Sequence, residues 1–134
     1  MGNIELDWTT INQQVDKISK YITENNIKLI VGICRGGLVP AVMLSNRTGI
    51  PMTCLEWQTR DGTVKDKRKE FKESNKDIMF IDDLADSGRT ICEIREAYPG
   101  ARFSVLINKT VDLELDFGAT LLYHNKQWIK FPWE

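Results

Sequence analysis

The chain has 134 residues, 42% of them hydrophobic and 28% charged, and its formal net charge is −1. These values predict a single folded domain, residues 1–134, with a hydrophobic core of its own. The balanced charge provides no overall positive field, which argues against nucleic acid or an anionic membrane as a partner. Any phosphate group must therefore be bound by local features of the chain.

The three cysteines, Cys34, Cys54 and Cys92, are widely spaced and form no CxxC pair. This pattern favours neither a disulfide framework nor a zinc site. The N-terminus lacks the apolar core of a signal peptide, and no apolar run approaches the length of a membrane span. We therefore expect a reducing compartment and a cytoplasmic location. The charge of Arg35 would lower the pKa of Cys34, but a small buried thiol is the favoured interpretation.

A helix is predicted directly after Asp7. Apolar residues recur there in steps of three and four, which places them along one face of a helix. These residues are Trp8, Ile11, Val15, Ile18 and Ile22. Thr10 and Gln13 have the spacing of a capping box at its start.

A strand and a second helix follow. The run "IKLIVGI" (27–33) is apolar and rich in β-branched residues, as in a strand that is covered on both faces. After "CRGG", the segment 38–49 predicts a helix, because Pro40 falls in its first turn and Gly49 provides a stop. The segment "IPMTCLEW" (50–57) predicts the next strand.

Residues 58–75 are polar, carry charges of both signs and show no clear periodicity. They predict a long loop, and loops of this length in a small domain are often lids or binding loops. Two further strands are predicted over 76–82 and 101–108, with a helix over 87–98 between them. The remainder of the chain, through 118–134, is short, aromatic and irregular, and predicts a cap packed on the sheet.

Strands that alternate with helices predict an α/β fold, with a central parallel sheet flanked by helices and joined by right-handed crossovers. In such sheets, ligands bind at the carboxyl ends of the strands. The segments that follow the four predicted strands hold all the unusual chemistry of the chain. One edge of the sheet is therefore the candidate functional site.

The segment "IDDLADSGRT" (81–90) combines an anion-binding turn with acidic residues. At Ser87 to Thr90 a strand turns into a helix, so free N–H groups, two hydroxyls and the positive helix end converge on a phosphate. Gly88 allows the backbone to approach the anion closely. The acids fit a ligand that carries a sugar diol or a metal ion beside its phosphate. A helix cap and a solvated strand end are the structural alternatives, whereas a phosphorylated sugar explains both halves.

The segment "IMFIDDLADSGRT" (78–90) resembles the signature of the type I phosphoribosyltransferases for binding 5-phosphoribosyl 1-pyrophosphate (PRPP). The segment 32–50, which contains "CRGG", resembles the pyrophosphate-binding loop and following helix of the xanthine-guanine phosphoribosyltransferases. The tail "QWIKFPWE" (127–134) resembles the purine-binding hood of that subgroup. The resemblance covers nearly the whole chain. It implies the type I fold, with a core of about residues 1–107 and a small C-terminal hood of about 108–134.

The resemblance implies a role for each matching position. Asp82 and Asp83 would meet the ribose hydroxyls of PRPP and help to organise Mg²⁺. The 5′-phosphate would be held by Ser87, Gly88, Arg89 and Thr90. The departing pyrophosphate would be held by Arg35, Gly36 and Gly37.

Asp86 is implied as the acid/base group near N7 of the purine. An ordinary carboxylate is ionised at neutral pH, and so accepts the proton lost as the base attacks C1 of the sugar. Arg35 and the glycine peptides supply hydrogen-bond donors to a group that gains negative charge as the bond breaks. Arg89 stands where the family often has a small residue or lysine, and would add a phosphate contact.

Recognition of the purine is implied for three residues near the end of the chain. Lys109 would contact the six-position oxygen, and a cation there favours guanine, xanthine or hypoxanthine over adenine. A solvated loop lysine is the alternative. Trp128 would stack on the purine face, and the backbone of Ile129 would contact its edge. The other tryptophans, Trp8, Trp57 and Trp133, are interpreted as core or interface residues.

The resemblance thus implies a Mg²⁺-dependent pentosyltransferase of purine salvage, which joins a 6-oxopurine to PRPP and releases a nucleoside 5′-monophosphate and pyrophosphate. It also implies a homodimer or tetramer. Two alternatives remain: a regulator of the same fold that senses PRPP or nucleotides, and a phosphoribosyltransferase for another acceptor. The presence of Asp86, Lys109 and Trp128 favours the purine enzyme over the regulator.

Overall fold

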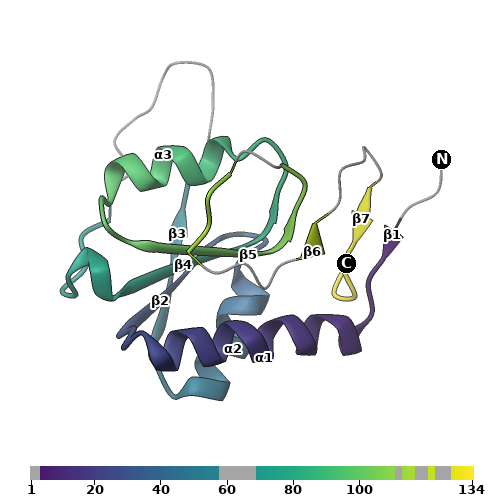
Figure 1. The fold of residues 1–134 in the computed structure, drawn as a ribbon, viewed down its shortest axis with the longest axis horizontal. Coiled ribbons are helices and arrows are strands. Elements are labelled where there is room, and N and C mark those ends of the chain that lie inside the picture. Colours follow the sequence, from purple (N-terminus) through teal and green to yellow (C-terminus); the bar gives the residue numbers. More distant parts are fainter. Residues whose placement is uncertain (1–3, 58–68, 111–112, 117–120, 123–127) are drawn as a thin grey trace.

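The computed structural model describes residues 4–57, 69–110, 113–116, 121–122 and 128–134. Its elements are β1 (Ile4–Glu5), α1 (Trp8–Glu24), β2 (Leu29–Cys34), α2 (Leu38–Thr48), β3 (Met52–Glu56), the 3₁₀ turn η1 (Asn75–Asp77), β4 (Ile78–Ala85), α3 (Arg89–Ala97), β5 (Arg102–Asn108), β6 (Leu121–Leu122) and β7 (Ile129–Lys130). This α/β architecture confirms the predicted fold class (Figure 1). Within the described ranges, each helix is too short or too polar to cross a membrane.

The main sheet has the strand order β3-β2-β4-β5-β6, and all its pairs are parallel. From β2 the chain continues to β3 on one side of the sheet, and from β4 it continues to β5 on the other side. Helices α1 and α2 lie on one face of the sheet and α3 lies on the opposite face (Figure 1). In an open parallel sheet, the ligand crevice lies at the carboxyl ends of the strands between which the winding reverses. The topology therefore points to the ends of β2 and β4.

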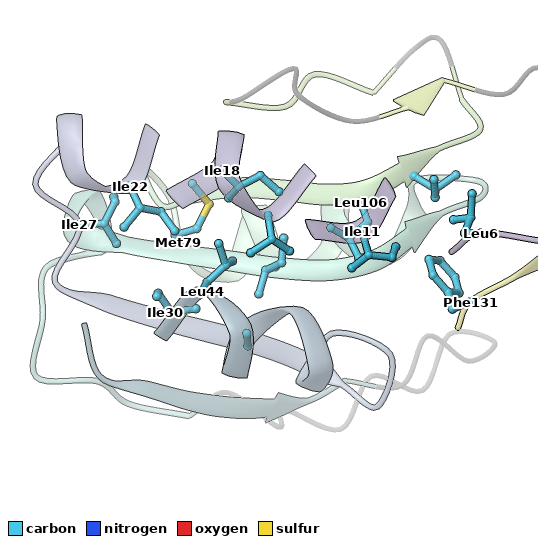
Figure 2. Close-up of a cluster of buried hydrophobic side chains, with 14 of the residues drawn as sticks. Leu6, Ile11, Ile18, Ile22, Ile27, Ile30, Leu44, Met79, Leu106 and Phe131 are labelled. Carbon is cyan, nitrogen blue, oxygen red and sulfur yellow. The ribbon is translucent and has the colours of Figure 1, made fainter. Parts of the chain in front are cut away.

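A cluster of buried side chains fills each face of the sheet. The cluster under α1 and α2 includes Ile11, Val15, Ile18, Ile22, Ile30, Leu44, Met79 and Leu106 (Figure 2). The cluster under α3 includes Phe80, Ile91, Ile94, Tyr98, Phe103 and Val105. Full burial of one such side chain stabilises the fold by about 1.5–3 kcal/mol. The two clusters hold β4, the central strand, between them.

Helix α1 begins directly after Asp7, as predicted, but its cap differs from the prediction. Asp7 is the N-cap residue, and its Oδ1 accepts a hydrogen bond from the N–H group of Thr10 at 2.8 Å. The predicted capping box of Thr10 and Gln13 is wrong, because the Asp7 carboxylate already satisfies this free N–H group. Trp8 is 46% exposed, and its ring lies 5.9 Å from that of Trp133. The buried stripe of α1 therefore begins at Ile11.

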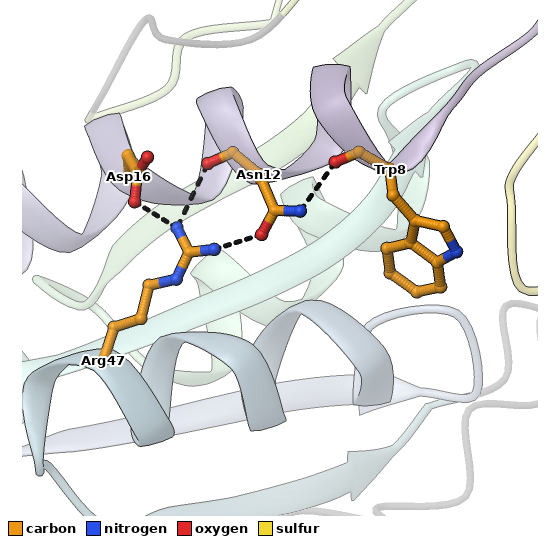
Figure 3. A network of polar contacts seen from close by, with 4 residues as sticks. All are labelled: Trp8, Asn12, Asp16 and Arg47. Atoms are coloured by element: carbon orange, nitrogen blue, oxygen red, sulfur yellow. Dashed lines mark hydrogen bonds and ion pairs between the residues drawn. The ribbon is translucent and has the colours of Figure 1, made fainter.

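A polar network joins α1 to α2 at the surface (Figure 3). Arg47 of α2 donates to the side chains of Asn12 and Asp16, and at 3.1 Å to the backbone carbonyl of Asn12. The amide of Asn12 donates in turn to the carbonyl of Trp8 at 2.8 Å. Gly49 then ends α2, as predicted. These contacts fix the two helices beside each other as one layer.

The two ends of the described chain meet in a small sheet. Strands β1 and β7 are parallel, with Ile4 opposite Ile129, and the N–H group of Ile4 donates to the carbonyl of Trp128 at 2.9 Å. Strand β6 extends the main sheet beside β5. The predicted irregular cap is therefore corrected in two respects. It contains strands, and the N-terminal segment pairs with it.

Candidate functional site

Strand β4 continues through Ala85, so the two acids lie within the strand and not after it. Asp82 is opposite Val105 of β5, and the ladder continues beyond both acids. The Asp82 and Asp83 side chains are both partly buried, and the N–H group of Asp83 donates to Oδ1 of Asp82 at 2.8 Å. The predicted strand end is therefore wrong, and so is the alternative of a solvated acidic pair. Backbone pairing with β5 extends the strand despite the polar side chains.

The environment of this pair disfavours two negative charges. Burial raises the pKa of Asp82 to about 8, and the adjacent charge of Asp83 adds to the effect. Burial also raises the pKa of Asp83, although hydrogen bonds from its neighbours oppose the change. Among the described residues, no lysine or arginine forms an ion pair with either carboxylate. The pair therefore favours a bound proton or a cationic ligand at neutral pH.

The donor set of this pair is compatible with Mg²⁺. Magnesium is typically bound by one or two carboxylates, with water and substrate phosphates completing its coordination. The described part of the chain contains no cluster of three or more His, Cys, Asp and Glu side chains suited to a metal ion. Asp82 and Asp83 thus fit a metal shared with a phosphate ligand. They do not fit a metal enclosed by protein side chains alone.

The loop after β2 packs directly against the acidic pair. A Cβ atom added at Gly36 would overlap the carboxylate of Asp83, and one at Gly37 would overlap the carbonyl of Ile81. Arg35 is exposed, and its peptide bond with Cys34 is cis. At Gly37 glycine is required because its backbone meets the backbone of β4, and at Gly36 any side chain would have to displace the Asp83 carboxylate. The "CRGG" segment and the acids therefore form one continuous surface.

The turn after β4 lies where the anion site is predicted. Gly88 adopts a left-handed backbone with φ 81° and is the N-cap of α3. The helix thus begins at Arg89, two residues later than predicted, because this backbone is not helical. Oγ of Ser87 accepts a hydrogen bond from the N–H group of Arg89 at 3.3 Å. The turn is therefore held in a shape that leaves a helix N-terminus open to an anion.

A cavity of about 160 Å³ lies at this turn. Its lining includes Asp82, Asp86, Ser87, Gly88, Arg89 and Thr90. The structure thus brings together the predicted PRPP-binding residues other than Asp83. Asp83 lies against Gly36 instead, on the side of the pyrophosphate loop. One acid therefore lies beside each of the two predicted binding segments, the turn after β4 and the loop after β2.

The predicted purine-binding residues lie outside this cavity. Lys109 follows β5, and its N–H group donates to the carbonyl of Ala85, the last residue of β4, at 2.9 Å. Trp128 is 65% exposed, whereas the side chain of Ile129 is buried in the core. The backbone of Lys109 is therefore tied to the end of β4. The indole of Trp128 is accessible to a ligand.

The Cys34 thiol and the Trp57 indole both lie near the site residues. Burial raises the pKa of Cys34 to about 11, and a hydrogen bond with Cys54 adds to this, so the thiol stays protonated beside Arg35. The indole of Trp57, interpreted from the sequence only as a core or interface residue, donates to Glu93 of α3 at 3.1 Å. No sequence signal links these two residues. Only the spacing of Arg89 and Glu93, four residues apart on a helix, was visible as a signal for an ion pair.

Known proteins resemble this chain over most of its length. The phosphoribosyl transferase domain family matches residues 6–134. A xanthine-guanine phosphoribosyltransferase of Cereibacter sphaeroides is 30% identical over 115 residues, which cover 80% of this chain and 69% of that protein. A protein of the same name from Idiomarina loihiensis is 29% identical over 139 residues, covering 96% and 85% of the two chains.

The fold is similar to that of a solved structure. The purine phosphoribosyltransferase from Pyrococcus horikoshii matches with a TM-score of 0.75 at 24% identity, over 100% of this chain and 95% of that chain. This likeness concerns the fold, and the family match rests on the sequence. The chain therefore belongs to the phosphoribosyl transferase domain family and has the type I phosphoribosyltransferase fold.

Proposed function

We propose that the protein is a Mg²⁺-dependent purine phosphoribosyltransferase, which transfers the 5-phosphoribosyl group of PRPP to a 6-oxopurine in purine salvage. The observation that carries this proposal is the cavity at the end of β4. It joins an open helix N-terminus to the partly buried carboxylate of Asp82, and the "CRGG" loop packs against the adjacent Asp83. A sugar with a phosphate at one end and a pyrophosphate at the other matches this sequence of groups.

We assign the parts of PRPP by the position of each residue in the family motif, and this arrangement supports the assignment. The turn at Ser87–Thr90 binds the 5′-phosphate through backbone N–H groups at the start of α3. Asp82 and Asp83 accept hydrogen bonds from the ribose hydroxyls and would hold Mg²⁺, which would supply positive charge beside the pyrophosphate. Gly36 and Gly37 offer backbone donors, and Arg35 offers a charged donor, to the pyrophosphate. These groups orient the bond between C1 and the leaving oxygen.

The proposed reaction exchanges one bond at C1 of the sugar. The bond to the pyrophosphate oxygen breaks, and the pyrophosphate leaves with the electron pair. A purine ring nitrogen forms the new bond to C1, and Asp86, which is exposed at the cavity, accepts the proton lost from the purine. Donors at the pyrophosphate stabilise the charge that develops there. The products are a nucleoside 5′-monophosphate and pyrophosphate.

Recognition of the base is assigned to Lys109 and Trp128. The backbone hydrogen bond between Lys109 and Ala85 holds this residue at the end of β4, beside the residues that bind the sugar. Its ammonium group favours a six-position oxygen over an amino group. The exposed indole of Trp128 offers a stacking surface, while the buried side chain of Ile129 anchors the backbone next to it.

A product assay tests the proposal. The purified protein is incubated with PRPP, Mg²⁺ and one of guanine, xanthine, hypoxanthine or adenine, and nucleotides are resolved by chromatography. We expect a monophosphate from at least one 6-oxopurine and little from adenine. The Asp86→Asn protein is the matched control, since it keeps the shape of the side chain and loses the proton acceptor. It should be slower by about 10²–10⁴-fold.

Other results would redirect the assignment. A nucleotide formed from a pyrimidine alone would keep the transferase and replace its acceptor. Binding of PRPP without any product, together with a biological effect that survives Asp86→Asn, would support the regulator of the same fold.

A further inference from the structure

A carboxylate on α3 connects the proposed phosphate site to a distant strand. Oε2 of Glu93 accepts a hydrogen bond from Nε of Arg89 at 3.2 Å. Oε1 of the same carboxylate accepts one from Nε1 of Trp57 at 3.1 Å. Both oxygens of Glu93 are thus engaged, each by a donor from a different part of the chain. Glu93 is the link between Trp57 and Arg89, residues 32 apart in number.

The two donors differ in how firmly they are held. The ring of Trp57, just after β3, is partly buried against the hydrophobic cluster under α3. The side chain of Arg89 is 60% exposed, whereas that of Glu93 is 22% exposed. An exposed ion pair of this spacing alone stabilises a helix by only about 0.3–0.5 kcal/mol. The bond from the fixed indole therefore supplies the rigidity that the pair itself lacks.

Arg89 has capacity left for a ligand. A guanidinium group has five N–H donors, and Glu93 uses only the one on Nε. Among the described residues, no contact to the terminal nitrogens of Arg89 is recorded. Arg89 also lines the cavity at the start of α3. An arginine held through Nε beside an anion site is suited to bind phosphate through its two terminal nitrogens.

We infer that Glu93 is a positioning residue, which holds Arg89 as a phosphate contact and is itself fixed by the indole N–H of Trp57. The inference rests on the proposed function, because it takes the ligand of the cavity to be the 5′-phosphate of PRPP. The simpler alternative is an ion pair on the helix surface without any effect on the ligand. The two differ in whether Trp57, which does not line the cavity, changes phosphate affinity through Arg89.

A double-mutant cycle separates these alternatives. The ligand is ribose 5-phosphate, which carries the phosphate ester without pyrophosphate, and its dissociation constant is measured by calorimetry. Trp57→Phe keeps an aromatic side chain and all charges and removes the N–H donor, together with the five-membered ring of the indole. We expect about threefold weaker binding for Trp57→Phe and about tenfold for Arg89→Met, from the loss of one neutral and one charged hydrogen bond. The double variant should bind no more weakly than Arg89→Met.

Trp8→Phe is the matched control, because Trp8 lies at the start of α1 against Trp133. It should bind ribose 5-phosphate as the wild type does. Glu93→Gln is the second variant, since it keeps the side-chain length and one acceptor. It should also bind about threefold more weakly. In steady-state assays, Trp57→Phe and Glu93→Gln should raise KM for PRPP by similar factors and leave kcat unchanged.

Three results would overturn the inference while the proposed function stands. The first is unchanged affinity in Trp57→Phe, and the second is a loss of affinity in Trp57→Phe that is equal with and without Arg89. The third is tighter binding of ribose 5-phosphate by Glu93→Gln, which would make Glu93 a competitor of the phosphate. A wild-type protein that binds neither ribose 5-phosphate nor PRPP would overturn the proposed function itself, and this inference with it.

Discussion

The two halves of β4 have opposite environments. Ile78, Met79, Phe80 and Ile81 are fully buried among apolar side chains of both clusters. The next residues, Asp82 and Asp83, continue the same hydrogen-bonded ladder, yet burial raises the pKa of both. The first half stabilises the fold. The second half holds polar groups where the fold alone gains little from them, which is typical of a ligand site.

Removing the Phe80 ring from the first half of β4 should have the largest effect on stability. The ring of Phe80 stacks on Phe103 with centroids 5.1 Å apart and lies 5.1 Å from Tyr98. Phe80→Ala should lower the free energy of unfolding by about 3–5 kcal/mol, because a cavity replaces these contacts. Urea titration measures this change. A loss below about 1 kcal/mol would show that β4 is not the centre of the core.

In the second half, Asp82→Asn should alter how stability depends on pH. The raised pKa means that the folded protein keeps a proton which the unfolded chain loses above about pH 4. Wild-type stability should therefore fall as pH rises toward about 8. Between pH 6 and 8 we expect the wild type to lose about 2 kcal/mol relative to Asp82→Asn. Urea titrations of both proteins at both pH values measure this difference. Parallel pH profiles of wild-type and Asp82→Asn stability would contradict the prediction.

Gly36→Ala tests the contact between the second half of β4 and the "CRGG" loop. The new methyl group would overlap the carboxylate of Asp83, and overpacking of this kind costs about 1–2 kcal/mol. The free energy of PRPP binding should fall by more than the free energy of unfolding, because β4 and the "CRGG" loop would move apart at the ligand site. Gly49→Ala is the matched control: its Cβ meets no atom within 4 Å, but the left-handed backbone (φ 73°) at the end of α2 is strained by a side chain, so it should lower stability and leave PRPP affinity unchanged. Equal PRPP affinity in Gly36→Ala and wild type would refute the shared surface.

The smallest effect is expected away from β4, at the network between α1 and α2. Arg47→Met removes the hydrogen bonds to Asn12 and Asp16, whose side chain is largely exposed. Stability should fall by less than about 1 kcal/mol, because solvent screens such pairs. Thermal unfolding measures the change in stability, and calorimetry measures the affinity for PRPP. A change in PRPP affinity would mean that this network influences the ligand site.

The repeating patterns of the chain predicted its architecture well. The spacing of Ile11, Val15, Ile18 and Ile22 indicated the buried face of α1, because helix periodicity is written locally in the sequence. The apolar run at the start of β4 indicated a buried strand for the same reason. The segment 58–68, part of the predicted loop, lies outside the described residues.

The errors arose where structure depends on partners distant in sequence. The predicted strand ended at Asp82, but pairing with β5 extends it through Ala85, and pairing does not depend on side-chain polarity. Strands β1 and β7 have two residues each, which is too short for any periodic signal. The bond from Trp57 to Glu93 requires the positions of β3 and α3 in space. None of these contacts leaves a local pattern.

The central claim is that the carboxyl end of β4 binds the phosphorylated sugar. Amide chemical shifts of the isotope-labelled protein, recorded while PRPP and Mg²⁺ are added, test it most directly. The account predicts that the largest changes fall on residues 82–90, with further changes at Gly36 and Gly37. Changes confined to another hollow, such as the one lined by Lys69, Phe71 and Tyr98, would contradict it.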